Sequence, residues 1–334
     1  MFITGKDPIF DKAWNELYNE TKFISPLYSK NALSYYSQRP KDQEKNIEDY
    51  SFVYMKDNKP CAALIIAKVI DKHRVDLLAY EAPGTSIVDS EKLSRSDIIK
   101  INTQVDSIFQ ELNGSFYYRD FLTDGDINLI TRRFLSLGCI PSPVFSSIID
   151  LRNSHEYLHR NIRKSYKSLI NWGNKTIKIE LYDYKNADIN AFNLLKDLHI
   201  KVSGRKTRSD ESWYTQYEMI KAKEAFVIIG TVDNTVVTGS FYMFSRNVCY
   251  YGVSASIREM FDKPLSHSLV WKAVEYAKEN GCQFFEMGEQ KFPGNFAEKE
   301  IDQKLIAISD FKAGFGGNIK TFIDLNFDNY NKIN

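Results

Sequence analysis

Two stretches, one in each half of the chain, carry the same pattern of hydrophobic and polar positions. Residues 51–70 and 225–244 each contain two runs rich in β-branched and aromatic residues, and an Asp-Asn pair separates the runs at 57–58 and at 233–234. A two-residue Asx turn between such runs is typical of a β-hairpin. Each stretch therefore predicts a hairpin.

The same series of predicted elements follows both hairpins. Each half continues with a strand, an amphipathic helix and a second strand, at 74–82, 96–112 and 115–121 and at 247–255, 265–281 and 283–289. Apolar residues recur every three or four positions in the helix of the second half, and Gly281 is placed to end it. Each half then closes with a helix, a glycine and a strand, at 132–151 and 309–325.

The spacing of these patterns indicates an internal duplication. Asp57 and Asp233 are 176 positions apart, and Asp150 and Asp324 are 174 apart. A hairpin that leads into a β-α-β unit forms a mixed sheet flanked by helices, and no GxGxxG follows a first strand. We therefore expect an α/β fold with mixed sheets in two tandem domains, 1–150 and 151–334, joined by a helix at 152–175.

Composition excludes few classes of protein. The chain has 334 residues, with 44 Lys and Arg against 43 Asp and Glu, so its net charge of +1 removes the usual argument for a DNA-binding protein. No apolar run approaches the roughly 20 residues of a membrane-spanning helix, and the N-terminus lacks the pattern of a signal peptide. We expect a soluble cytoplasmic protein, and its oligomeric state stays open.

The metal-binding residue types are sparse. Four widely spaced cysteines form no CxxC and are expected to be buried free thiols in a reducing compartment. His155 and His159 are spaced to share one face of a helix, but no further ligand type accompanies them. No metal is expected.

Four stretches of the second half resemble the GNAT acyltransferase fold and, more closely, the duplicated two-GNAT arrangement of the FemABX-like proteins. They are the basic helix at 156–172, the segment 198–214, the stretch 249–289 that opens with CYYGVSA, and IAISDFKAGFGG at 306–317. The first half matches only by pattern. The resemblance implies a degenerate N-terminal GNAT-like domain and an active site in the C-terminal domain or in the cleft between the two.

Proteins with this duplicated two-GNAT arrangement catalyse different reactions. Fem peptidyltransferases use aminoacyl-tRNA to extend peptidoglycan bridges. Another branch is similar to sugar N-acyltransferases, which move an acyl group from acyl-CoA to the amine of a nucleotide-linked, often dTDP-linked, amino-dideoxy sugar for surface polysaccharide such as O-antigen. The run 203–217 followed by AFVIIG looks more like the second branch. An acetyl or hydroxyacyl group such as 3-hydroxybutanoyl is compatible. A tRNA-dependent transferase and an inactive GNAT-like binding module stay as alternatives.

The phosphate-binding loop departs from the GNAT pattern. GNAT enzymes usually hold the CoA pyrophosphate with a glycine-rich loop that opens the helix after the fourth strand. Residues 258–268 occupy this place here and contain no glycine. The candidate cofactor contacts are Lys263, Ser266 and His267, together with backbone N–H groups near Val253 and Ser254 that would hold the thioester oxygen.

Amine acylation needs a polarised carbonyl and an amine that loses a proton, held together in one site. No nucleophile elbow or catalytic triad is present, so direct attack without a covalent enzyme intermediate is expected. The resemblance places Lys312 beside the transferred acyl group, although a lysine that stabilises its helix C-terminus is the plainer alternative. It also favours Tyr251 as a catalytic residue of its strand. Phe311, which precedes the lysine, is expected to contact the substrate.

The other candidates rest on the residues alone. Tyr250 alternates in direction with its neighbour on the strand and is expected to bind substrate. Glu286 and Glu289 are placed to relay the proton through water. The two tyrosines, and likewise Glu286 and Glu289, are also compatible with a purely structural role in the sheet.

The acceptor contacts are predicted from arginine chemistry. Arg205 and Arg208 lie in a loop, and their forked guanidinium groups match the oxygens of a diphosphate. Trp213 is expected either to stack on the nucleotide base or to pack in the core. Arg163 belongs to a basic helix face that either contacts phosphate or RNA or is simply solvated.

Overall fold

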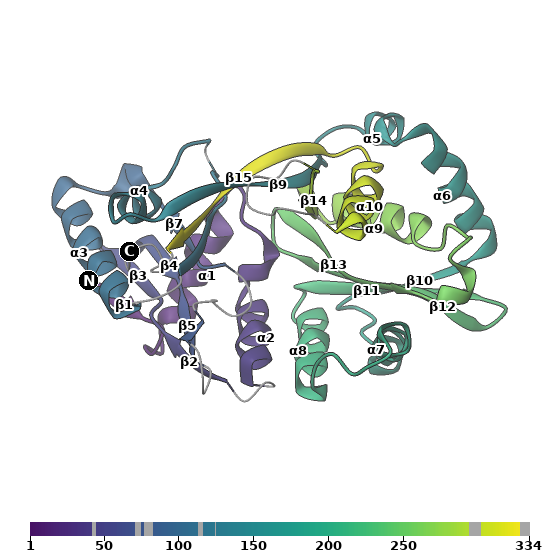
Figure 1. The fold of residues 1–334 in the computed structure, drawn as a ribbon, viewed down its shortest axis with the longest axis horizontal. Coiled ribbons are helices and arrows are strands. Elements are labelled where there is room, and N and C mark those ends of the chain that lie inside the picture. The colour runs from purple at the N-terminus through teal and green to yellow at the C-terminus, as the bar shows by residue number, and fades with distance from the viewer. Residues whose placement is uncertain are drawn as a thin grey trace. The chain divides into compact units, whose positions relative to one another are not determined.

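A computed structural model of the chain describes residues 1–41, 45–70, 75–76, 83–112, 116–123, 125–293 and 302–327. The chain forms two compact units (Figure 1). Unit 1 contains residues 1–24 and 28–144 and the chain from 321 onward, and unit 2 contains residues 25–27 and 145–320. The units therefore divide at 144 and 320, whereas one boundary at 150 was expected.

Among the residues that the structure describes, unit 1 holds seven short strands in two sheets, with helices after and between them. Its elements are β1 (Phe2–Thr4), α1 (Phe10–Glu20), α2 (Lys30–Lys41), β2 (Asn46–Asp49), β3 (Phe52–Lys56), β4 (Lys59–Ile65), β5 (Ala67–Ile70), β6 (Val75–Asp76), β7 (Thr85–Val88), α3 (Arg95–Leu112), β8 (Phe116–Asp120) and α4 (Leu129–Ser136). The sheets have the orders β1-β3-β4-β7 and β2-β5-β6. Strand β8 belongs to neither of these sheets. It pairs with a strand near the C-terminal end of the sequence, described below.

Unit 2 holds one mixed sheet. Its elements are α5 (His155–Asn161), α6 (Lys164–Thr176), β10 (Lys178–Tyr182), α7 (Ile189–Ser203), α8 (Asp210–Lys221), β11 (Ala225–Val232), β12 (Thr235–Phe244), β13 (Val248–Ser256), α9 (His267–Glu279), β14 (Phe284–Gln290) and α10 (Gln303–Ala313). The strand order is β10-β11-β12-β13-β14-β9, where β9 spans Ile140–Asp150. Among the five described pairs of this order, β13–β14 is parallel and the other four are antiparallel.

The two predicted hairpins have the same geometry. Asp57 and Asn58 have φ of 49° and 59°, and Asp233 and Asn234 have φ of 47° and 61°. Two central residues with positive φ define the type I′ turn that Asx residues tolerate. Each hairpin also contains a register shift, between residues 54 and 55 in the first and between 230 and 231 in the second. These shifts are again 176 positions apart, as an internal duplication predicts.

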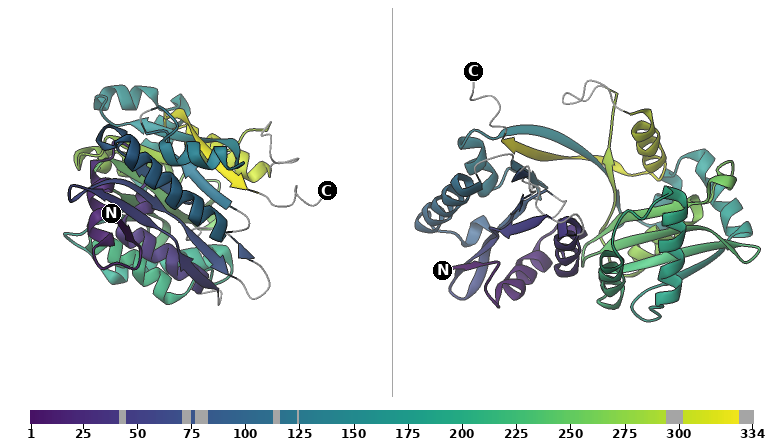
Figure 2. Two further views of the ribbon diagram at one scale, coloured as in Figure 1. Left: turned by 90° about the vertical axis from the view of Figure 1, so that its left-hand side faces the viewer. Right: turned by 60° about the horizontal axis from the view of Figure 1, so that its bottom comes forward.

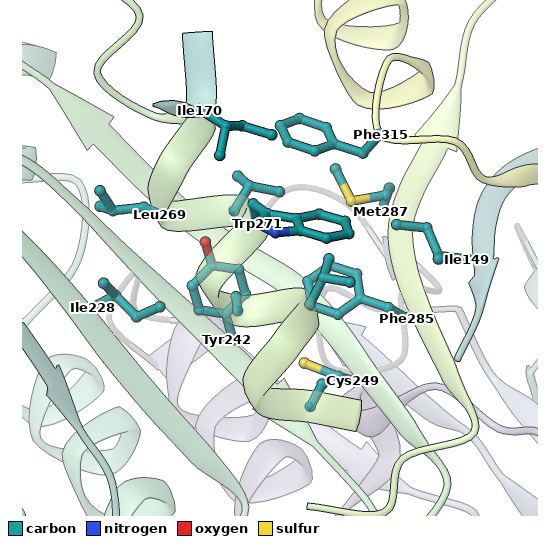
Figure 3. Close-up of a cluster of buried hydrophobic side chains, with 14 of the residues drawn as sticks. Ile149, Ile170, Ile228, Tyr242, Cys249, Leu269, Trp271, Phe285, Met287 and Phe315 are labelled. Carbon is teal, nitrogen blue, oxygen red and sulfur yellow. The ribbon is translucent and has the colours of Figure 1, made fainter. Parts of the chain in front are cut away.

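Helices cover both faces of the sheet of unit 2 (Figures 1 and 2). On one face, Phe192 of α7 packs edge-on against Phe241, with ring centroids 6.1 Å apart. On the other face, Trp271 of α9 lies in a buried cluster with Tyr242 and Phe285 (Figure 3). Burial of these large apolar side chains supplies most of the driving force for folding. The sheet is thus the middle layer of three, and its strand ends position the candidate site.

Most predicted elements are confirmed. The helix expected at 152–175 is two helices, α5 and α6, because the chain is extended at Ile162 and Arg163, with ψ of 140° and 131°. The strand expected at 74–82 lies outside the described residues except for β6. All four cysteines are buried free thiols, as expected. Within the described residues, no helix is long and apolar enough to cross a membrane.

The closing strands are exchanged between the two halves of the sequence. Residues 145–150 of β9, from the first half, pair antiparallel with β14 in unit 2. The end of β15 (Asn318–Phe327), from the second half, pairs antiparallel with β8 in unit 1. A buried ion pair fixes this second pairing, since Arg119 donates to both carboxylate oxygens of Asp324 at 2.6 and 2.8 Å. This exchange explains why the units divide at 144 and 320.

Candidate functional site

The candidate site lies where the two parallel strands of unit 2 part. The β13–β14 ladder contains three pairs and ends at Tyr250 and Glu286. Both strands are irregular just beyond this point, because Gly252 is an extra residue opposite β12 and Met287 is an extra residue opposite β9. Gly288 follows with a φ of +87°. Strands that separate at their carboxyl ends leave room for a ligand between them.

Lys312 reaches this point from the last turn of α10. Its Nζ lies 3.1 Å from the position that a Cβ on Gly288 would take, and the hydroxyl of Tyr250 lies 3.5 Å from the same position. A Cβ at position 288 would therefore crowd the Lys312 ammonium group and touch the Tyr250 hydroxyl. Lys312 forms no hydrogen bond or ion pair among the residues that the structure describes. Burial lowers the pKa of Lys312 from its ordinary value, and the charges of Glu289 and Glu286 oppose this shift.

Two further polar side chains border the lysine. Tyr250 and Glu286 are partners in the ladder, so both side chains point to the same face of the sheet. Glu286 is buried, and one of its carboxylate oxygens accepts a hydrogen bond from Ser146 at 3.2 Å. Glu289 is partly exposed and lies 3.6 Å from Lys291. The site thus combines a cation, a phenol and a buried carboxylate.

Close packing around the glycines of 311–317 holds Lys312 in place. A Cβ on Gly314 would overlap the ring of Tyr166, and one on Gly316 would lie 2.7 Å from the carbonyl oxygen of Asn161. The backbone N–H of Arg163 donates to the carbonyl of Gly314 at 2.9 Å. The start of α6 is therefore fixed against the end of α10, and only glycine permits this approach at Gly314.

Arg163 binds the C-terminal end of α10. Its guanidinium donates to the carbonyl of Asp310 at 3.2 Å and lies 5.1 Å from the ring of Tyr166. A cation at a helix C-terminus interacts favourably with the exposed carbonyl groups there. Arg163 therefore contacts the helix that carries the lysine, at Asp310, two residues before Lys312.

His267 and Phe311 pack together in an aromatic cluster. The ring of His267 lies 4.5 Å from Tyr166 and 5.2 Å from Phe311. Burial lowers the pKa of His267. The imidazole is therefore neutral at pH 7 and packs between the start of α9 and the end of α10, instead of offering a positive charge to phosphate.

The other predicted cofactor contacts lie along β13 and at the start of α9. Val253 pairs with Phe241, and the hydroxyl of Ser254 lies 3.0 Å from that of Ser240. The hydroxyl of Ser266, at the start of α9, lies 3.1 Å from that of Ser256. Lys263 is exposed and pairs with its neighbour Asp262 at 2.8 Å. Each of these residues has its partner on β12, on β13 or in the segment before α9, and within the described residues none forms a hydrogen bond or ion pair with Lys312.

Tyr251 points away from Lys312. Its ring stacks on Tyr242, with centroids 5.6 Å apart, on the face of the sheet that packs against α9. Burial raises the pKa of Tyr251. The structure thus brings Tyr250, predicted as a substrate contact, to the lysine, and packs the partly buried Tyr251, the tyrosine favoured for catalysis, against the core.

The predicted acceptor residues lie around the loop between α7 and α8. Arg205 is exposed and follows Gly204, which ends α7 in a left-handed conformation. Arg208 stacks over Trp213 at 4.3 Å and donates to Gln216 at 3.0 Å. Trp213 is buried with only 2% of its surface exposed. Trp213 therefore packs in the core and is not exposed for stacking on a nucleotide base.

Sequence reasoning missed Ser146 and Gly288. Gly288 interrupts a buried strand, and a glycine at such a position often marks a bulge or a close approach. Ser146 had no signal in the sequence, because it reaches Glu286 only through the exchanged strand β9. For metals, the described residues contain no group of three or more His, Cys, Asp or Glu side chains that could hold an ion.

Comparison with known proteins defines the fold. No protein-family model and no curated protein sequence matches the chain significantly. Among solved structures, it is similar to FemX, with a TM-score of 0.66 and 11% identity over 97% of this chain and 96% of that one. It is also similar to L-PGS from Bacillus licheniformis, with a TM-score of 0.57 and 13% identity over 98% and 93%. The chain therefore shares the mixed α/β fold of these two structures.

A third structure extends this result. The tandem GNAT protein from the clavulanic acid biosynthesis pathway matches with a TM-score of 0.50 and 12% identity, over 98% of each chain. Both units of this chain are thus described by a tandem GNAT-like fold, as expected. At these identities, the likeness concerns the fold and leaves substrates to be argued from the site.

Proposed function

We propose that unit 2 is the catalytic unit of a GNAT-like transferase, which moves an acyl or aminoacyl group from an activated donor to a primary amine. One observation carries the proposal. Lys312 is half-buried, forms no ion pair among the described residues, and lies beside Tyr250 at the point where β13 and β14 part. Burying an ammonium group costs free energy, so a lysine held in this way suits a site where a negative charge develops.

The chemistry follows from this geometry. The amine nitrogen of the acceptor attacks the carbonyl carbon of the donor, and the carbonyl oxygen becomes an oxyanion. The Lys312 ammonium stabilises that oxyanion. The intermediate then collapses, the bond to the leaving group breaks, and the amine loses its proton. The carbon–nitrogen bond replaces the carbon–sulfur bond of a thioester or the carbon–oxygen bond of an ester.

Tyr250 and Glu286 complete this mechanism. The Tyr250 hydroxyl lies beside the same Gly288 position as the lysine and is suited to donate a hydrogen bond to the oxyanion or the leaving group. Glu286 is a carboxylate on the same face, suited to accept the proton of the amine directly or through one water. Glu289 is more exposed and serves as a second acceptor for that proton.

For substrates, we propose acyl-CoA as donor and a nucleotide-linked amino sugar, dTDP-linked in our first choice, as acceptor. The exposed Arg205 supplies a guanidinium for the diphosphate, as its forked geometry favours. Lys263 and Ser266, which flank the start of α9, would contact the phosphates of CoA. The transferred group is acetyl or a short hydroxyacyl chain.

An aminoacyl-tRNA donor is the second candidate, and a specific observation favours it. Arg160, Arg163 and Lys164 are exposed on α5 and at the start of α6, and the loop before α9 contains no glycine to cradle a pyrophosphate. Exposed cations on one face suit the backbone of a nucleic acid. The same Lys312 chemistry would then break an ester bond.

A coenzyme-release assay separates these candidates. The chain is incubated with acetyl-CoA and hydroxyacyl-CoA over a panel of nucleotide-linked amino sugars, and free thiol is measured with and without each acceptor. Acceptor-dependent thiol release supports the first candidate. Its absence, together with salt-sensitive binding of tRNA, supports the second. If neither donor class binds nor reacts, the transferase proposal fails.

A further inference from the structure

Unit 1 contains an open pocket that the proposed function does not use. Its volume is about 890 Å³, and every residue that lines it belongs to unit 1. The walls are formed by the end of α1, by residues 86–91, by the end of β8 and by the segment that leads into α4. Pockets of roughly 300–1,000 Å³ are typical of sites for small molecules.

The pocket opens where two parallel segments part, as the Lys312 site does in unit 2. Gly84 and Tyr118 form a single parallel bridge between the start of β7 and β8. Beyond this bridge, Ser86 on one strand and Asp120 on the other both line the pocket. The duplication has therefore left the same opening in the sheet of unit 1, with different side chains around it.

The buried wall of the pocket carries a charge without a counter-ion. Asp120 is only 3% exposed, and its carboxylate accepts hydrogen bonds from the backbone N–H groups of Leu122 and Asn128, from the Asn128 amide and from the Thr131 hydroxyl. All four donors are neutral. No lysine or arginine in the described part of unit 1 forms an ion pair with this carboxylate. Buried charges in proteins are normally paired, so a cation of the ligand would complete this arrangement.

The charged residues that line the pocket are also mostly negative. Five lining residues are carboxylates, Glu20, Asp89, Glu91, Asp120 and Asp126, and two are cations, Lys22 and Arg132. Lys92, next to the pocket, pairs with Asp89 at 2.8 Å and with Glu20 at 3.6 Å. A negative balance remains, which attracts cations and repels phosphates.

Neutral polar groups complete the wall. The Ser86 hydroxyl bonds to the Tyr118 hydroxyl and to the Asn128 amide oxygen, and Ser86 and Asn128 both line the pocket. Thr123 adds a third polar side chain. Hydroxyl and amide groups of this kind bind hydroxylated ligands, since each donates and accepts hydrogen bonds.

We propose that unit 1 carries a second small-molecule site, which binds a hydroxylated primary amine of the amino-sugar class. The ammonium group of the ligand lies toward the carboxylate of Asp120, and the hydroxyl groups contact Ser86 and Asn128. This site is separate from the Lys312 site and does not depend on the reaction proposed for unit 2. It involves binding alone, so no bond is made or broken.

Calorimetric titration of the full chain with D-glucosamine at low ionic strength tests the proposal, with neutral D-glucose as the matched probe. Glucosamine is expected to bind, and glucose to bind at least tenfold more weakly, because it lacks the ammonium group. Added salt is expected to weaken glucosamine binding, since the rim charges are exposed. Equal binding of the two sugars, or no binding of glucosamine at millimolar concentration, would overturn the proposal.

Variants locate the bound ligand. Asp120→Asn keeps the shape of the side chain and is expected to abolish glucosamine binding. Because Asp120 also holds the start of α4, a rim variant, Glu91→Gln with Asp126→Asn, keeps the test independent of folding and is expected to raise Kd about tenfold. Glu16→Gln, on the exposed surface of α1 outside the pocket, should leave Kd unchanged.

A last variant separates this site from the reaction centre. Lys312→Met should bind glucosamine like the wild type. Loss of binding in Lys312→Met, or wild-type binding in the rim variant and in a folded Asp120→Asn chain, would place the ligand elsewhere and refute the proposal.

Discussion

Replacing Lys312 by methionine tests the reaction centre most directly. Methionine keeps the length and most of the apolar packing of the lysine stem and removes the charge. A unit charge about 4 Å from an oxyanion contributes on the order of 4 kcal/mol at an effective dielectric constant of 20. The nearby Glu286 and Glu289 reduce this figure, so we expect a loss of about 3 kcal/mol, or roughly 10²-fold in kcat.

The assay is thiol release under saturating donor and acceptor. The loss should appear in kcat, with little change in the KM of the donor, because the interaction is made with charge that develops only in the transition state. Lys304→Met is the matched control, since Lys304 lies on the same helix and is exposed. A folded Lys312→Met enzyme with near-normal kcat would show that the lysine only ends its helix.

The same variant has a defined effect on stability. Burial lowers the pKa of Lys312 in the folded chain from its ordinary value of 10.5, so between the two pKa values the unfolded chain binds more protons than the folded chain. The free energy of unfolding of the wild type therefore rises with pH across this window. Lys312→Met lacks this rise, and urea unfolding at a series of pH values up to 10.5 should show the difference between the two chains.

Three further predictions concern the surroundings of the site and the exchanged strand. Tyr250→Phe should lower kcat by about tenfold through the loss of one hydrogen bond, and Tyr251→Phe should lower it less; the reverse order in thiol release would move the reaction to the other face of the sheet. Gly314→Ala should cost about 1–3 kcal/mol in urea unfolding and also lower kcat, because the added methyl group overlaps the ring packed above it; wild-type stability would contradict the packing described. Asp324→Asn should cost about 3–5 kcal/mol, because it leaves Arg119 buried without its counter-ion, and a loss below 1 kcal/mol would show that water reaches the pair.

Local patterns predicted the hairpins and helices well. The Asp-Asn pairs specify their turns directly, because few residues other than glycine, Asn and Asp adopt positive φ without strain. Amphipathic spacing likewise located α3 and α9 within two residues of their observed limits. Turn residues and amphipathic spacing depend on neighbours in the sequence, so they predict local structure without knowledge of the fold.

Local sequence patterns did not predict which strands pair across the chain or where the helix at 152–175 breaks. The exchange of β9 and β15 depends on pairing between residues more than 130 positions apart, and no local pattern records which partner a strand takes. The break between α5 and α6 was missed because Ile162 continues the apolar stripe of the helix even though its backbone is extended.

The candidate site was partly predictable. The glycine-rich segment after Lys312 identified the lysine through its resemblance to the FemABX-like proteins. The choice between Tyr250 and Tyr251 was not settled by alternation along the strand, because alternation shows that the two point to opposite faces without showing which face α10 approaches. Trp213 presented the same difficulty, since a buried and a stacked tryptophan look alike in sequence.

The exchanged strand β15 has a consequence for how the chain folds during its synthesis. Domains generally fold in the order in which the ribosome releases them, with the N-terminal one first. Unit 1 contains the first residues of the chain, yet β8 gains its antiparallel partner only when residues 323–327 have emerged. Strands β10 to β14 of unit 2, and the segment of β9 that pairs with β14, have all been synthesised by residue 290. Those strands of unit 2 can therefore pair before β8 meets β15. In unit 1, the edge of β8 waits for this partner, and Arg119 waits for Asp324, until translation reaches the end of β15.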